Sequence, residues 1–175
     1  SNILDFSSGI RVMGILNVTP DSFYDRYSKT SAAIDRGLQM VDEGADVVDI
    51  GGESSRPPLY GSVLKIDTAE EIRRVIPVIT ALRRQTSAPL SIDTVKYEVA
   101  CEALDAGVDI INDISALEDP RMVGLAASSK APVILMHRYN HLIRDEKREI
   151  NQEFPSDIVG YLRNKIDYAK THSIE

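Results

Sequence analysis

The sequence predicts an α/β protein built around a parallel β-sheet. Short apolar runs without polar alternation recur along the chain, as is typical of strands buried on both faces. Amphipathic helical stretches separate these runs. Two of the stretches end at Gly44 and Gly107, each of which leads directly into the next apolar run. Strands that alternate with helices in this way favour a parallel sheet covered by helices.

Five apolar runs have the character of strands. They consist mainly of valine, isoleucine and leucine, and they occupy residues 12–16, 47–50, 89–92, 109–112 and 132–136. The helical stretches that follow them occupy residues 31–43, 67–85, 97–106, 120–129 and 157–171. Helical spacing predicts that the last stretch turns Ile158, Tyr161, Leu162 and Ile166 inward.

The composition is that of an ordinary globular chain. The 175 residues include 43% apolar and 27% charged residues and carry a net charge of −7, which argues against disorder and against non-specific nucleic-acid binding. No apolar run approaches the roughly 18 residues of a membrane span, and the N-terminus lacks the pattern of a signal peptide. Cys101 is the only cysteine, which excludes a disulfide framework. We therefore expect a cytoplasmic protein with no membrane or nucleic-acid partner.

Polar side chains follow the carboxyl end of every predicted strand. Because these ends converge on one rim of a parallel sheet, five such coincidences favour a ligand site. Each one could also be explained as a helix cap. The residues are Asn17, Asp49, Asp93, Thr94, Asn112, Asp113 and His137.

The residue types at this rim suggest what would bind. Asp93 and Asn112 offer in-plane hydrogen bonds that suit a fused heterocycle, and Met136 offers a polarisable surface for a flat ring, although it could equally be a core residue. Asn17 offers a neutral oxygen for Mg²⁺ whose other ligands come from phosphates. Arg56 suits a phosphate oxyanion, or serves only solubility.

Other chemical motifs are weak. His137 and His141 lie four residues apart, but a third metal ligand is missing. The glycine pair at residues 51–52 matches neither a P-loop nor a dinucleotide fingerprint, and no nucleophile motif for acyl transfer occurs.

Five segments resemble the signatures of dihydropteroate synthases, in the order of that family. They read MGILNVTPDSF at residues 13–23, DIGGESSRP at 49–57, SIDT at 91–94, AGVDIINDIS at 106–115 and LMH at 135–137. The resemblance implies a (β/α)8 TIM barrel, of which this chain holds about the first five βα units. It also implies transfer of 6-hydroxymethyl-7,8-dihydropterin from its diphosphate to p-aminobenzoate, with release of pyrophosphate, in folate biosynthesis.

The resemblance assigns roles to individual residues of this sequence. Asp93 and Asn112 would hold the pterin, with Ile114 and Met136 lining its pocket. Asn17 would contact the diphosphate and its Mg²⁺.

Two loops complete the implied site. Ser55 and Arg56 would bind the diphosphate, Phe23 and Pro57 would flank p-aminobenzoate, and Asp25 would belong to the first loop. The implied catalytic residues are Asp93, Asn112, Arg56 and Asp25. Sulfonamides would compete with p-aminobenzoate, and the full-length enzyme would form a homodimer.

The sequence departs from the family pattern at three places. The glycine pair that usually follows Asp25 is absent, and Pro58 stands where the second loop usually has glycine. The later signatures, which include the lysine shared by both substrates, do not occur within the 175 residues. The strand-to-strand steps average about 30 residues, so eight units would need about 240. We therefore interpret residues 1–175 as a single pterin-binding barrel domain that is incomplete at its C-terminus.

Three alternatives stay open at this point. The chain could be a non-catalytic or truncated pterin-binding module. It could also resemble a methyltetrahydrofolate–corrinoid methyltransferase, although such an enzyme has no diphosphate to hold in loops like those at residues 17–23 and 54–57. The remaining alternative is an α/β domain whose polar strand ends serve only as caps.

Overall fold

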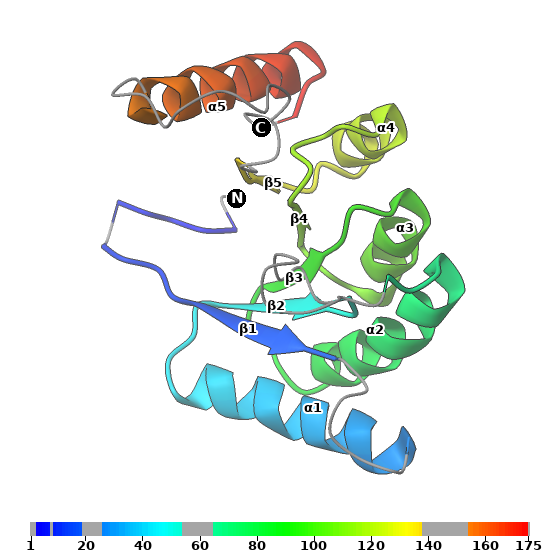
Figure 1. Cartoon of the computed structure of the whole chain (residues 1–175). Coiled ribbons are helices and arrows are strands. Elements are labelled where there is room, and N and C mark those ends of the chain that lie inside the picture. The colour runs from blue at the N-terminus through cyan, green and yellow to red at the C-terminus, as the bar shows by residue number, and fades with distance from the viewer. Residues whose placement is uncertain (1–2, 8, 19–25, 54–64, 138–153, 175) are drawn as a thin grey trace.

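The protein is a curved parallel sheet with helices along its outer side (Figure 1). The computed structural model describes residues 3–7, 9–18, 26–53, 65–137 and 154–174, with the backbone alone described at residues 26–29 and 154–155. The sheet has five strands in the order β1-β2-β3-β4-β5, and each neighbouring pair is parallel. The strands are β1 (Met13–Asn17), β2 (Val47–Gly51), β3 (Leu90–Asp93), β4 (Ile110–Asp113) and β5 (Val133–Leu135).

A helix follows each strand. The helices are α1 (Arg26–Asp42), α2 (Thr68–Arg83), α3 (Tyr97–Ala106), α4 (Pro120–Ser129) and α5 (Phe154–Thr171). Figure 1 shows α1 to α4 succeeding one another along the outer side of the sheet, whose inner side is concave. Strands paired in sequence order, with α1 to α4 along one side of the sheet, correspond to the first five units of a (β/α)8 barrel. The predicted fold class is confirmed.

The boundaries differ modestly from the sequence prediction. Four strands end one residue later than predicted, so that Asn17, Gly51, Asp93 and Asp113 are the last residues of their strands. Helix α1 begins five residues before the predicted start at residue 31. The residues at this early end are mostly polar, and apolar periodicity therefore gives no signal there.

The main core lies between the sheet and helices α1 to α3. Val75, Ile79 and Leu82 of α2 are completely buried against Ile50 and Ile92 of the strands, as the helical spacing predicts. Ala103 of α3 and Val48 of β2 belong to the same cluster. The strand side chains that point outward therefore pack against the helices. The strand side chains that point inward take no part in this core.

A smaller core joins α4, β4 and the C-terminal end of α5. Ala169 and Ile174 are buried there together with Met122. Along the rest of α5, Ile158, Tyr161 and Leu162 are half-buried. The predicted inward orientation of Ile166 is wrong, because its side chain is 43% exposed. Helix α5 packs through its C-terminal end, so helical periodicity alone overestimates its buried face.

Within the described ranges, no helix is both long and apolar enough to cross a membrane.

Candidate functional site

The polar strand ends form one continuous row across the sheet. Asn17 of β1 is paired in register with Gly51 of β2, Gly51 with Asp93 of β3, and Asp93 with Asn112 of β4. Residues in register on neighbouring parallel strands project to the same side of a sheet. The structure therefore brings together the three predicted site residues Asn17, Asp93 and Asn112 at the rim.

Gly51 leaves room at the centre of this row. A Cβ atom on Gly51 would lie 3.5 Å from Asp93 Oδ2 and 3.9 Å from Asn17 Oδ1. The two oxygen atoms thus flank a space that any larger residue would begin to fill. The absence of a side chain at this position allows a ligand to approach the backbone between them.

Asp49 lies below the row and hydrogen-bonds to it. Asn112 Nδ2 donates to Asp49 Oδ2 at 2.9 Å across the intervening strand β3. Asp49 is only 3% exposed. Burial raises the pKa of Asp49 above its usual 3.8, while the nearby side chains of Ser91 and Asn112 act in the opposite direction. Sequence reasoning noted Asp49 as a strand end but gave it no role. The available signal was a carboxyl group inside an otherwise apolar strand.

Two other polar strand-end residues serve the backbone. Asp113 is buried, and its carboxylate accepts hydrogen bonds from Ser115 N at 2.8 Å, Ser115 Oγ at 2.6 Å and Leu117 N at 2.9 Å. Thr94 Oγ1 accepts from Lys96 N at 3.1 Å. Asp113 and Thr94 are therefore turn residues. The helix-cap interpretation is wrong for both, because the N-caps of α3 and α4 are Lys96 and Asp119.

The predicted apolar pocket residues flank the row. Ile114 directly follows β4 and is half-buried. Met136 directly follows β5 and is 39% exposed. Met136 lies two residues beyond Ile134, which is paired in register with Asn112, and it therefore continues the side of the sheet that carries Asn112. Both residues are in reach of the rim.

Five predicted site residues lie outside the described part of the structure. They are Phe23, Asp25, Ser55, Arg56 and Pro57.

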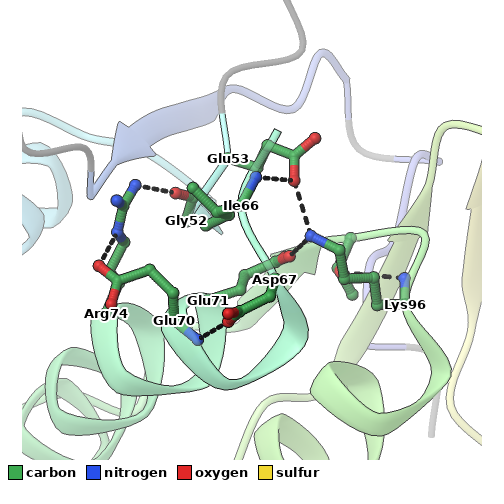
Figure 2. Close-up of polar contacts among 9 residues, drawn as sticks. Gly52, Glu53, Ile66, Asp67, Glu70, Glu71, Arg74 and Lys96 are labelled. Carbon is green, nitrogen blue, oxygen red and sulfur yellow. Dashed lines mark hydrogen bonds and ion pairs between the residues drawn. The ribbon is translucent and has the colours of Figure 1, made fainter. Parts of the chain in front are cut away.

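A charged cluster involves the described residues on either side of segment 54–64 (Figure 2). Lys96 Nζ lies 2.6 Å from Glu53 Oε2 and 2.5 Å from Glu71 Oε2. Glu71, on α2, is 1% exposed. Burial lowers the pKa of Lys96, but its hydrogen bonds and ion pairs with Glu53 and Glu71 outweigh that effect, and the net pKa is raised above 10.5.

Further contacts fix both ends of the segment that contains residues 54–64. Arg74 Nη1 donates to the carbonyl oxygen of Gly52 at 2.9 Å, and the backbone N–H of Ile66 donates to Glu53 Oε2 at 3.4 Å. Figure 2 shows these groups converging from β2, α2 and the start of α3. Sequence reasoning missed this cluster, because its members are far apart in the chain.

The family of the chain follows from comparison with known sequences. The family described as "Pterin binding enzyme" matches residues 13–175.

The chain belongs to the pterin binding enzyme family.

Individual relatives of this chain point the same way. The chain is 43% identical over 161 residues to a dihydropteroate synthase of Streptococcus pyogenes, covering 90% of this chain and 56% of the relative. It superposes with a TM-score of 0.81 and 41% identity on Xanthomonas albilineans dihydropteroate synthase with 4-aminobenzoic acid, covering 94% and 57% of the two chains. The same enzyme in complex with 7,8-dihydropteroate gives a TM-score of 0.76 at 39% identity, covering 94% and 56%. The chain therefore spans somewhat more than half the length of these relatives.

The rim of this pterin binding enzyme offers few groups for a metal ion. Among the described residues, no three histidine, cysteine, aspartate or glutamate side chains come together as a metal site. Asn17 supplies one neutral amide oxygen, and the Asp93 carboxylate borders the same space above Gly51. Such a donor set suits a hard cation that takes most of its ligands from phosphates and water.

Proposed function

We propose that this chain is the pterin- and diphosphate-binding portion of a dihydropteroate synthase, which transfers 6-hydroxymethyl-7,8-dihydropterin from its diphosphate to p-aminobenzoate. The observation that carries the proposal is the row of Asn17, Asp93 and Asn112 across the rim, in a chain 43% identical to a dihydropteroate synthase. The carboxylate of Asp93 and the amide of Asn112 offer hydrogen-bond acceptors and a donor that suit a heterocycle, and the open backbone at Gly51 lets it approach.

The described residues suggest how the reaction would be assisted. The bond to the diphosphate breaks, positive charge develops on the pterin, and the aromatic amine captures the resulting cation. The Asp93 carboxylate would stabilise that positive charge, and Asn112 would orient the ring. Asn17 would hold Mg²⁺ through its amide oxygen. When bound, Mg²⁺ would neutralise charge on the leaving diphosphate.

The second substrate would bind toward the loops outside the described residues, which contain Phe23 and Pro57. A solved relative contains 4-aminobenzoic acid, which supports p-aminobenzoate as that substrate. Competition by sulfonamides, a homodimer of the full-length protein and a cytoplasmic location belong to the same proposal.

A second candidate is a pterin-binding module without catalysis. It rests on the same row of Asn17, Asp93 and Asn112, which would bind a pterin whether or not turnover follows. The methyltransferase alternative has less support, because the relatives named above are dihydropteroate synthases.

Calorimetric titration of the chain with the pterin diphosphate, with and without Mg²⁺, tests the binding. We expect the Asp93→Ala variant to lose about 2 kcal/mol of binding free energy, or about 30-fold in affinity, because a hydrogen-bonding partner of the ring is removed. Asp105→Ala, which changes an exposed aspartate of α3, is the matched control and should bind like the wild type. Unchanged affinity in Asp93→Ala would remove Asp93 from the site, and affinity independent of Mg²⁺ would remove the metal from Asn17.

Release of pyrophosphate on addition of p-aminobenzoate separates the two candidates. A synthase releases it, whereas a binding module holds the pterin diphosphate without turnover.

A further inference from the structure

Asp49 is a buried carboxyl group that the proposed reaction does not use. It belongs to β2, two residues before Gly51, and is paired in register with the fully buried Ser91 of β3. Within the described ranges no cation lies at salt-bridge distance from Asp49, and its partner is the amide of Asn112. Burying a carboxyl group without a cation costs folding free energy. The presence of Asp49 at this level of the sheet therefore suggests that it has a function.

The contact with Asp49 fixes which way the Asn112 amide points. The NH₂ of Asn112 donates to Asp49, and the carboxylate form of Asp49, which only accepts hydrogen bonds, holds the amide in this orientation. The 2.9 Å hydrogen bond uses one of the two N–H bonds. When this is the N–H that points away from the carbonyl oxygen, the carbonyl oxygen and the second N–H of Asn112 are left side by side, as an acceptor and a donor in a fixed order.

That fixed order matches one edge of a pterin. The amino-pyrimidine edge presents an amino donor next to a ring-nitrogen acceptor, which is the pattern that an asparagine amide reads in adenine. A ring with an oxo group in place of the amino group presents an acceptor where the pterin has a donor. If the Asn112 amide were free to turn over, it would accommodate both edges.

We propose that Asp49 is a positioning residue that holds the amide of Asn112 in the one orientation that selects an aminated pterin edge over its oxo counterpart. This inference rests on the proposed pterin-binding function. Asp49 would act through Asn112, without touching the ligand.

The selectivity test compares two ligands on three proteins. Affinities of 6-hydroxymethylpterin and 6-hydroxymethyllumazine, its 2-oxo counterpart, are measured by calorimetry for the wild type, Asp49→Asn and Ser91→Ala. Asp49→Asn keeps the shape but can donate as well as accept, so the ratio of the two affinities should fall about 10-fold or more. Ser91→Ala removes a buried polar group at the same level and keeps the carboxylate, so the ratio should be retained. An unchanged ratio in folded Asp49→Asn would overturn the inference.

A ligand-free measurement separates this inference from the proposed function. The side-chain amide resonances of Asn112 are assigned in ¹⁵N-labelled protein by their loss in Asn112→Ser. One amide proton of the wild type should be shifted downfield by the carboxylate, and the shift should vanish in Asp49→Asn but persist in Ser91→Ala. Absence of the shift from the wild type would overturn the inference even where pterin binds. Presence of the shift, with no binding of either ligand, would refute the proposed function and the selective role together, while leaving the orienting contact established.

Discussion

Replacing Lys96 by methionine should destabilise the protein severely. The substitution keeps most of the aliphatic volume but removes the cation that lies 2.5 Å from Glu71 and 2.6 Å from Glu53. The side chain of Glu71 is only 2% exposed, so its carboxylate cannot be rehydrated without disturbing the packing of α2 on β2. Removing one partner of a buried ion pair costs about 3–5 kcal/mol. We expect about 3 kcal/mol, the low end, because Lys96 and Glu53 are partly exposed.

The assay is urea unfolding at pH 7, followed by circular dichroism and extrapolated linearly to water. Lys170→Met, at an exposed site in the last turn of α5, is the control and should change the unfolding free energy by less than about 0.5 kcal/mol. In the double variant Lys96→Met/Glu71→Gln no buried charge is left unpaired. It should therefore recover about 1 kcal/mol or more of the loss in Lys96→Met alone.

Two outcomes would refute this reasoning. If Lys96→Met lowers the unfolding free energy by less than about 1 kcal/mol, the ion pairs of Lys96 contribute no more than solvent-exposed salt bridges do. Strictly additive effects of the two substitutions would show that Lys96 and Glu71 are not coupled. The pH dependence gives an independent check. The pKa of Lys96 is raised in the folded state, so its contribution is fully present below pH 10.5 and is lost as the pH rises through the raised value.

Two further predictions concern β2. A Cβ atom at Gly52 would lie 2.9 Å from both Glu71 Cγ and Val75 Cγ1. Gly52→Ala should therefore lower the free energy of unfolding in urea by about 1–3 kcal/mol. A Cβ atom at Gly51 meets nothing closer than 3.5 Å, so Gly51→Ala should keep the unfolding free energy and weaken ligand binding. Equal losses of unfolding free energy in the two variants would contradict the packing argument. The raised pKa of Asp49 means that the folded state holds its proton more tightly than the unfolded state, so wild-type stability should fall as the pH rises from 3.8 through the raised value. Between pH 3 and 7, the melting temperature of Asp49→Asn should rise relative to that of the wild type as the pH increases. A difference in melting temperature that does not change with pH would contradict the prediction.

The rim of the site could be predicted from the sequence because it follows from chain order. Once five apolar runs are assigned to one parallel sheet, the residues at their carboxyl ends must meet, as Asn17, Asp93 and Asn112 do. The same logic cannot separate ligand-facing groups from turn-forming ones. Asp113 and Thr94 satisfy backbone donors, which depends on the local path of the chain after each strand.

Contacts between distant elements could not be predicted. Glu71 occupies a buried position on α2 although a charged residue in a helical pattern is normally assigned to the exposed face. Its burial depends on Lys96, which arrives from the start of α3. Likewise, the hydrogen bond between Asn112 and Asp49 spans strand β3, and no repeating sequence pattern predicts it. Side-chain pairing of this kind is set by tertiary geometry.

The contacts of Glu53 and Arg74 have a consequence for how this family can vary. Glu53 Oε2 accepts a hydrogen bond from the backbone of Ile66, and Arg74 donates one to the carbonyl oxygen of Gly52. These contacts hold together the two described ends of the segment that contains residues 54–64. Once its ends are fixed, doubling the length of a connecting segment costs only about 0.6 kcal/mol. Insertions between these two ends therefore change the free energy of folding little. Relatives can thus differ in the length of this segment, and in the ligand contacts it makes, while keeping the same scaffold.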